Sequence, residues 1–599
     1  MEAGAGGTRK SPEWSGRTRR PLLATPQREN HAEAGSPLKA RTMTRRIRGP
    51  LSALSVALVG TLLGSCDGPA APGADFDIVE ATIQDMQQAM EEGLVTARDL
   101  VEAHLVRIAL YEERVNAVIA VNAHALAEAD RLDRERAEGR VRGPLHGVPI
   151  ALKDNVHTTD MPTTGGALAF EGYIPPYEAT LTANLREAGA IILAKTVMTE
   201  LANFMAAGMP GNYSAVGGYG LNPYDPRRDP REGRNDGRPV MNVGGSSSGI
   251  GTAMSFWAAN VGTETSGSIL SPANANMLAG IKPTVGRISR WGVIPITGDQ
   301  DTAGPMARTV ADAALLLGVL EGAAPDPDDP ATARCEPPSN GDYAPFLRAD
   351  GLQGARIGIP RALYYDSVQA PDDDGYRGGA SPEILAAMAE AIEILQAQGA
   401  TVVDPADIPS VINPNPDDNL LLAGGSSVLD YGMKRDFNAW LASLGETAPV
   451  STLTELREWN LEHRSAGSMK YEQARLDGAD ELDLEASRAR YEADRARDLR
   501  LNGEEGIDAV MEALDLDALL FPGSGGAGLA ARPGHPTVIV PFATVPNTSG
   551  PPFPDGFEPR PRPNGVSFTG GACSEPRLIE LAYAFEQATL RRMAPPGFP

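Results

Sequence analysis

Cysteine is nearly absent from this chain of 599 residues, which holds only three: Cys66, Cys335 and Cys573. None stands in a Cys-x-x-Cys pair or in a cluster with histidine, so the sequence offers no recognisable structural zinc site. Outside the cytoplasm Cys335 and Cys573 could form one disulfide, although the sequence alone leaves their pairing open.

Positive charge is also scarce: 53 Lys and Arg residues stand against 78 Asp and Glu, a formal net charge of −25. Such an acidic surface argues against a nucleic-acid partner. Long apolar runs are missing too, because the run from Leu51 to Leu63 is too short to span a membrane comfortably. Glycine (65) and proline (50) are abundant, which favours a loop-rich fold over a helical bundle.

The first 65 residues have the composition of a leader and not of a folded domain. Residues 1–42 are basic and rich in Gly, Ser and Pro, as in a disordered or non-native extension. Residues 43–65 have the layout of a signal peptide, with arginines before the apolar run. The end of this segment, Leu63-Gly64-Ser65-Cys66, resembles a bacterial lipobox, whose cysteine is lipidated. An ordinary signal peptide or an uncleaved anchor is the alternative interpretation.

A lipidated Cys66 predicts an exported bacterial lipoprotein, held on the membrane in the periplasm or cell envelope by its N-terminal lipid anchor. Residues 66–77 would then be a tether, and residues 78–599 the folded domain. Apolar residues at three- and four-residue spacing predict that this domain begins with helices over 78–92, 97–111 and 123–139. Thr96 is a suitable N-cap for the second of them.

Lys153 occupies an unusual place in the sequence LHGVPIALKDN, which spans residues 145–155. It directly follows a short apolar run, Val148 to Leu152, that predicts a buried strand. An ammonium group loses hydration at such a place, so its pKa falls, and a neutral lysine can act as a general base. The plainer interpretation is a lysine that reaches the surface or pairs with Asp154.

Two loops rich in Gly and Ser flank a mostly apolar segment further along the chain. They read GGSSSG, over residues 244–249, and GTETSGS, over residues 262–268. Because they carry few bulky side chains, such loops can bring backbone N–H groups and hydroxyls close to a ligand. They predict a binding or catalytic site.

Taken together, these motifs resemble the amidase signature family in order and in residue type. The resemblance covers roughly residues 80–590 and continues after the second loop through PANANMLAGIKPTVGRIS and QDTAGPMAR. It implies an α/β fold with a large mixed central β-sheet covered by helices on both faces. It also implies hydrolysis of the C–N bond of linear amides or peptide amides, as in peptide and enantioselective amidases, without cofactor or metal. The partner would be a small-molecule amide substrate; the oligomeric state is left open.

The resemblance also implies the roles of particular residues. Lys153 would be the base, Ser246 a bridging serine with a cis peptide bond, and Ser268 the nucleophile that forms an acyl-enzyme. The backbone N–H groups of Thr265, Ser266, Gly267 and Ser268 would form the oxyanion hole, and Ser247 would support the network.

One departure from the family pattern lies between the two serines. Ser246 and Ser268 stand 22 positions apart, two fewer than the pattern has, so the segment 250–261 is shortened. The connection must tighten there, or its helix must end early. This departure supports an alternative, a non-catalytic amidase-like lipoprotein.

A second alternative is an esterase of the α/β-hydrolase type. Residues 245–249 also satisfy G-x-S-x-G, in which Ser247 would be the nucleophile and His535 the late histidine. That interpretation leaves Lys153 and the GTETSGS loop without a role. A tRNA-dependent amidotransferase is disfavoured, because an exported lipoprotein would not meet aminoacyl-tRNA.

Overall fold

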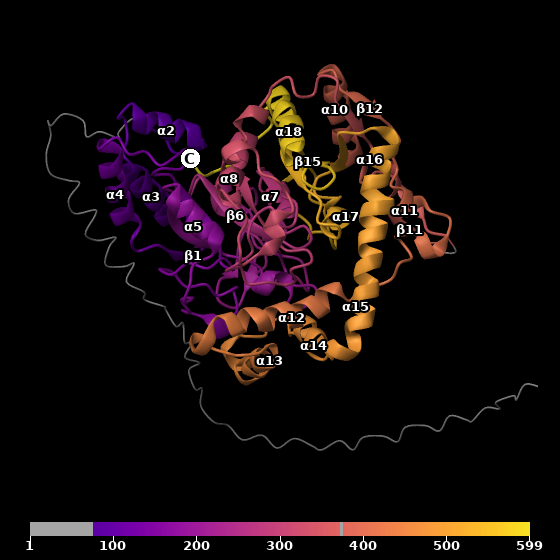
Figure 1. Ribbon diagram of the computed structural model, residues 1–599, viewed down its shortest axis with the longest axis horizontal. Coiled ribbons are helices and arrows are strands. Elements are labelled where there is room, and N and C mark those ends of the chain that lie inside the picture. Colours follow the sequence, from indigo (N-terminus) through magenta and orange to yellow (C-terminus); the bar gives the residue numbers. More distant parts are fainter. Residues whose placement is uncertain (1–75, 372–374) are drawn as a thin grey trace, which may run out of the picture. The chain divides into compact units, whose positions relative to one another are not determined.

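A mixed sheet of eleven strands runs through the computed structural model, which describes residues 76–371 and 375–599 (Figure 1). In spatial order its strands are β1 (Val118–Val121), β3 (Ile191–Thr196), β2 (Pro149–Lys153), β6 (Ala259–Glu264), β8 (Thr302–Ala307), β7 (Ala279–Lys282), β14 (Thr537–Val545), β15 (Arg562–Thr569), β13 (Ala518–Pro522), β9 (Arg356–Gly358) and β12 (Thr401–Val403). Two small hairpins lie outside it, β4 (Tyr213–Ser214) with β5 (Gly218–Tyr219) and β10 (Ser367–Gln369) with β11 (Tyr376–Gly378).

Three neighbouring strands, β3, β2 and β6, run parallel and are buried along their whole length. Parallel strands covered on both faces read as near-continuous apolar runs, which is the pattern of PIALK and IILAKT. Leu152 in β2 pairs with Val261 in β6, so both strands end at the same edge of the sheet. Side chains that follow these strands therefore meet there.

Helices flank this sheet, as predicted (Figure 1). Their bounds are α2 (Ile83–Glu91), α3 (Ala97–Val115), α4 (Ala125–Ala137), α5 (Thr180–Glu187), α6 (Ile250–Ala253), α7 (Leu270–Ala275), α8 (Val310–Glu321), α9 (Arg361–Tyr364), α10 (Pro382–Ala397), α11 (Pro409–Ile412), α12 (Val428–Ser443), α13 (Leu453–Glu462), α14 (Ala474–Asp480), α15 (Leu484–Leu499), α16 (Asp508–Leu514), α17 (Ala527–Ala531) and α18 (Glu575–Thr589). The three helices predicted near the start are present as α2, α3 and α4, and Thr96 caps α3 by accepting from the Asp99 N–H.

A second apolar core lies under α12, α13 and α14, which Figure 1 shows grouped together. Phe437 and Trp440 of α12 pack there with Phe170 and Met209, which come from the chain before the first Gly/Ser loop. The helical segment is thereby fixed to the residues that lead into that loop.

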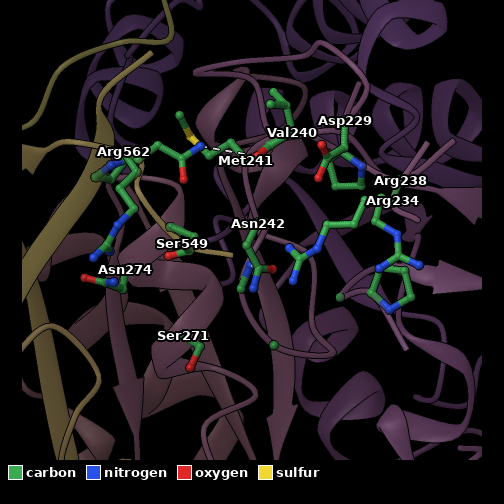
Figure 2. Close-up of a pocket in the computed structure, with 18 of the residues that line it drawn as sticks. Asp229, Arg234, Arg238, Val240, Met241, Asn242, Ser271, Asn274, Ser549 and Arg562 are labelled. Atoms are coloured by element: carbon green, nitrogen blue, oxygen red, sulfur yellow. Dashed lines mark hydrogen bonds between the residues drawn. The ribbon is translucent and has the colours of Figure 1, made fainter. Parts of the chain in front are cut away.

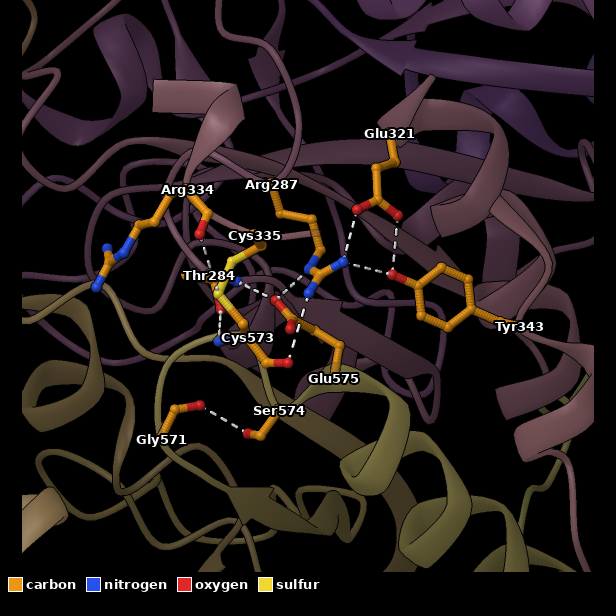
Figure 3. Close-up of a disulfide and its surroundings, with 10 residues drawn as sticks. All are labelled: Thr284, Arg287, Glu321, Arg334, Cys335, Tyr343, Gly571, Cys573, Ser574 and Glu575. Atoms are coloured by element: carbon orange, nitrogen blue, oxygen red, sulfur yellow. Dashed lines mark hydrogen bonds and ion pairs between the residues drawn. A yellow bond between two sulfur atoms is a disulfide. The ribbon is translucent and has the colours of Figure 1, made fainter. Parts of the chain in front are cut away.

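A disulfide joins Cys335 to Cys573, with their Cα atoms 5.5 Å apart (Figure 3). It ties a Pro- and Asp-rich loop to the turn before α18. Beside it, the Arg287 guanidinium contacts the carboxylates of Glu321 (2.6 Å) and Glu575 (2.9 Å). The pairing that the sequence left open is therefore present in the structure.

The predicted extension 1–42, the signal peptide 43–65 and the lipidation site Cys66 all lie outside the described residues. In the part of the chain that is described, no helix has the length and apolar character needed to cross a membrane.

Candidate active site

Lys153 ends strand β2 and is completely buried. Its Nζ lies 2.8 Å from Ser246 Oγ, 2.7 Å from Thr263 Oγ1 and 3.1 Å from the Thr263 carbonyl oxygen. The side chain neither reaches the surface nor pairs with Asp154, so the plainer interpretation from the sequence was wrong.

Burial lowers the pKa of Lys153 to about 7, because the ammonium loses its hydration. The negative charges of Asp301 and Glu264 act in the opposite direction. With this pKa, about half of the Lys153 side chains are neutral at pH 7 and able to accept a proton.

Ser246 lies in a loop that packs directly on the second Gly/Ser loop. The Ser247 N–H donates to the Ser268 carbonyl (3.2 Å), and a Cβ added to Gly245 would lie 2.8 Å from Ser268 Cα. Asn212 Nδ2 donates to the Gly245 carbonyl at 2.9 Å and so holds the loop from its other side. The two serines named from the sequence are thus brought together, 22 positions apart.

The expected cis peptide bond at Ser246 is not found. Within residues 76–371 and 375–599 the only cis bond joins Asp404 to Pro405, so the bond before Ser246 is trans. Gly244, with φ of +99°, makes the turn that carries Ser246 to Lys153 without a cis bond.

Residues 265–268 form a loop whose backbone donors are unused. No described residue accepts a hydrogen bond from the N–H groups of Thr265, Ser266, Gly267 or Ser268. The Ser268 side chain is half-buried, and its hydroxyl has no hydrogen-bond partner among the described residues, Ser246 included. These four N–H groups are therefore free to donate to a bound ligand.

Two carboxylates hold this loop in place. Glu264 Oε2 accepts from the N–H groups of Ile269 (2.7 Å) and Leu270 (2.9 Å), which fixes the start of α7. Asp301 accepts from the Thr265 hydroxyl and, through Oδ2, from the Ile296 N–H at 2.8 Å. Both carboxylates anchor the backbone on either side of Ser266.

The segment 250–261 forms a short, compact connection. Helix α6 ends after four residues, and Ser255 then takes a positive φ of +54° before β6 begins. Trp257 Nε1 donates to Thr252 Oγ1 (2.8 Å), and the Arg308 guanidinium donates to the carbonyls of both residues. The segment is fully buried, and the loops on either side of it remain in contact.

The nucleophile-elbow alternative does not fit the geometry. Ser247 is completely buried, and its hydroxyl donates to the Thr263 carbonyl at 2.9 Å. His535 Nε2 pairs with Asp508 at 2.8 Å, and its Nδ1 has no hydrogen-bond partner among the described residues. Ser247 therefore holds the loop against β6 and bonds to no histidine of the described residues.

Sequence reasoning missed the residues that surround Lys153. Thr263 supplies two of its three contacts, and Asn155 Nδ2 donates to the same Thr263 hydroxyl at 3.0 Å. Both residues stand in motifs that carry the family resemblance, Lys153-Asp154-Asn155 and Gly262-Thr263-Glu264, but no local pattern tells that their side chains meet. No three His, Cys, Asp or Glu side chains of the described residues gather in a way that could hold a metal ion.

A cavity of ≈ 460 Å³ lies beside this site (Figure 2). Gly244 and Gly245 form part of its wall, as does Ser271, one turn of chain beyond Ser268. Lys153, Ser246 and Ser268 are not in the wall, so the cavity adjoins the site without enclosing it.

Known proteins share this architecture. The model of the amidase family matches residues 99–579. A probable amidase of Arabidopsis thaliana is 34% identical over 531 residues, which cover 87% of this chain and 92% of that protein. A glutamyl-tRNA(Gln) amidotransferase chain of Synechococcus sp. (strain WH7803) is 32% identical over 526 residues, covering 84% of this chain and 96% of that one.

Among solved structures, the native peptide amidase from Stenotrophomonas maltophilia is similar over 88% of this chain and 99% of its own, with a TM-score of 0.71 and 35% identity. The family match spans most of the chain and includes both Gly/Ser loops and the Lys153 strand. The protein belongs to the amidase signature family.

Proposed function

We propose that this protein hydrolyses the C–N bond of linear carboxamides, peptide amides included, by a Lys153–Ser246–Ser268 relay. The observation that carries the proposal is the 2.8 Å contact between the buried Lys153 amine and the Ser246 hydroxyl. The likeness to peptide amidase supports the choice of amide substrates.

The relay begins at the neutral amine of Lys153. Its two N–H groups serve the carbonyl and hydroxyl oxygens of Thr263, which leaves the lone pair for the Ser246 hydroxyl proton. As Ser268 Oγ attacks the substrate carbonyl carbon, its proton passes to Ser246, and the Ser246 proton passes to Lys153. This step requires the half-buried Ser268 side chain to turn its hydroxyl towards Ser246, across the contact between the two loops.

The tetrahedral intermediate places negative charge on the former carbonyl oxygen. The unused N–H groups of residues 265–268 are the donors for that oxygen, each typically worth about 3–4 kcal/mol in such sites. Collapse breaks the C–N bond, and the proton returns through Ser246 to the leaving nitrogen. Water then attacks the acyl ester by the same route, releasing the acid and restoring Ser268.

We further propose that the protein works outside the cytoplasm, anchored by lipid on Cys66. The disulfide between Cys335 and Cys573 supports this location, because such bonds persist in oxidising compartments. A role on tRNA, as the name of the Synechococcus relative states for that protein, is accordingly not favoured.

A serine-directed fluorophosphonate probe tests the proposal on the full-length chain. We expect labelling of the wild type, none of Ser268→Ala or Lys153→Ala, and undiminished labelling of His535→Ala. Labelling that survives Ser268→Ala would overturn the nucleophile assignment. A wild-type chain that neither reacts with the probe nor cleaves any member of an amide panel would favour the non-catalytic alternative.

A further inference from the structure

The cavity beside the Gly244–Gly245 turn is unusually basic for so acidic a chain (Figure 2). Among the described residues, Asp229 is the only acidic one in its wall. Against it stand four arginines, Arg231, Arg234, Arg238 and Arg562. The volume of ≈ 460 Å³ is in the range that holds a small organic molecule.

Two of these arginines already have carboxylate partners. Arg231 contacts both oxygens of Asp229, at 2.8 and 2.7 Å, and is itself buried. Arg238 contacts both oxygens of Asp236, at 2.9 and 2.7 Å. Their charges are neutralised within the protein, and the only acid in the cavity wall is used in doing so.

The other two arginines have no such partner. Neither Arg234 nor Arg562 makes a side-chain hydrogen bond or ion pair with any described residue. The Nε atom of Arg562 is buried and still unpaired, and burial lowers the pKa of this guanidinium. A partly buried guanidinium without a counter-charge loses hydration that no protein group replaces. An anion bound in the cavity would supply the missing hydrogen bonds and opposite charge.

The two unpaired side chains face a common space. Arg562 opens strand β15, whereas Arg234 comes from the loop between β5 and the first Gly/Ser loop. Figure 2 shows them on opposite sides, with Asn242 and Ser549 between them in that view. Guanidinium groups bind carboxylates through paired, charge-assisted hydrogen bonds, which makes a carboxylate the fitting ligand.

We propose that this cavity binds the carboxylate of an acidic amide substrate through Arg234 and Arg562. The proposal rests on the amidase function proposed above and names its substrate class: amides that carry a free carboxylate away from the scissile bond. The cavity lies close to the proposed nucleophile, because Gly245 is in its wall and a Cβ added to Gly245 would lie 2.8 Å from Ser268 Cα. Ser271, also in the wall, donates its N–H to the Gly267 carbonyl at 2.9 Å.

A matched pair of substrates tests this on the full-length chain: hexanamide and adipamic acid, which differ by the terminal carboxylate. We expect a higher kcat/KM for adipamic acid. Arg234→Gln and Arg562→Gln should each lower kcat/KM for adipamic acid about tenfold or more. The kcat/KM for hexanamide should change less than about twofold. The control is Arg464→Gln, an exposed arginine that pairs with Glu472 away from the cavity, which should change neither. A preference for adipamic acid that survives both substitutions, or no preference at all, would overturn the proposal.

Binding of adipate to the Ser268→Ala chain, measured by calorimetry, separates this proposal from the amidase function. We expect saturable binding that Arg562→Gln weakens about tenfold or more and that weakens as salt is raised. If adipate binds in this way while the wild type cleaves no amide, the cavity assignment stands and the proposed function fails. If hexanamide is cleaved but adipate does not bind, the function stands and the cavity assignment fails.

Discussion

Two lysines at the ends of similar apolar runs lie on neighbouring strands of this protein and differ in what they contact. Lys153 ends PIALK in β2, and Lys195 is the fifth residue of IILAKT in the neighbouring strand β3; both are completely buried. Lys195 Nζ donates to the Val156 carbonyl (2.6 Å) and lies 3.7 Å from the Asp154 carboxylate. Lys153 contacts Thr263 and the Ser246 hydroxyl, and it makes no ion pair with a carboxylate in the described part of the chain.

The difference teaches that burial alone does not make a catalytic base. Loss of hydration lowers the pKa of both groups, to about 7 for Lys153 and about 8 for Lys195. The Asp154 charge raises the pKa of Lys195 from direct contact and leaves its proton committed to an ion pair. Lys153 instead faces a hydroxyl whose proton it can take. Both lysines are equally buried, so the group that each contacts, a serine hydroxyl or a carboxylate, decides which one can act as a base.

Replacing Lys153 gives the largest expected effect. Lys153→Met should lower kcat/KM by about 10⁴-fold, because a relay without its base keeps only binding and oxyanion stabilisation. The free energy of unfolding should stay the same or rise, since a buried amine without an ion partner is removed. Steady-state kinetics and urea denaturation of the same preparation measure both. A free energy of unfolding lowered by several kcal/mol would instead indicate that Lys153 is a structural group like Lys195.

Replacing Lys195 should give the opposite pattern. Lys195→Met leaves the buried Asp154 carboxylate without its counter-charge, which should lower the free energy of unfolding by about 3–5 kcal/mol. Adding Asp154→Asn should recover part of that loss. In the protein that remains folded, fluorophosphonate labelling of Ser268 should persist. Abolished labelling with unchanged stability would erase the distinction drawn between the two lysines.

The pH dependence sharpens the comparison further. Because only the neutral form of Lys153 accepts a proton, kcat/KM should rise with pH and inflect near 7. Asp301 raises the pKa of Lys153 by its charge, so Asp301→Asn should move the inflection to lower pH. The measurement is a kcat/KM profile from about pH 5 to 9 for both proteins. An inflection that moves upward, or stays in place, would contradict the assignment of the base.

The smallest effects are expected at the two residues of the elbow interpretation. Ser247→Ala removes the hydroxyl that bonds the Thr263 backbone, and His535→Ala removes a side chain whose partner is Asp508. Each should lower kcat/KM less than about tenfold, because neither side chain contacts Lys153 or the Ser246 hydroxyl and each loss removes only supporting hydrogen bonds. Near-complete inactivation by His535→Ala, in a protein of normal stability, would instead support the nucleophile-elbow interpretation.

Much of the fold could be read from local patterns. Thr96 caps α3 because a threonine at that position accepts the N3 N–H whatever surrounds the helix. The strand before Lys153 was recognisable because a strand buried on both faces is apolar throughout. The trans bond before Ser246, the pairing of Cys335 with Cys573 and the contacts of Thr263 were not readable, because each depends on how distant segments pack.

The sequence by itself determined the family, through several motifs in a fixed order, and it determined that Lys153 would end a strand. The family motif pointed to Lys153, but the local pattern alone does not distinguish it from Lys195, since both lysines lie at the end of an apolar run. The sheet order β3–β2–β6 made that choice: β2 lies against the strand that leads into the Ser268 loop, and β3 lies one strand further away. A side chain reaches only its own neighbours, so strand order decided which buried amine meets a serine and which meets an aspartate.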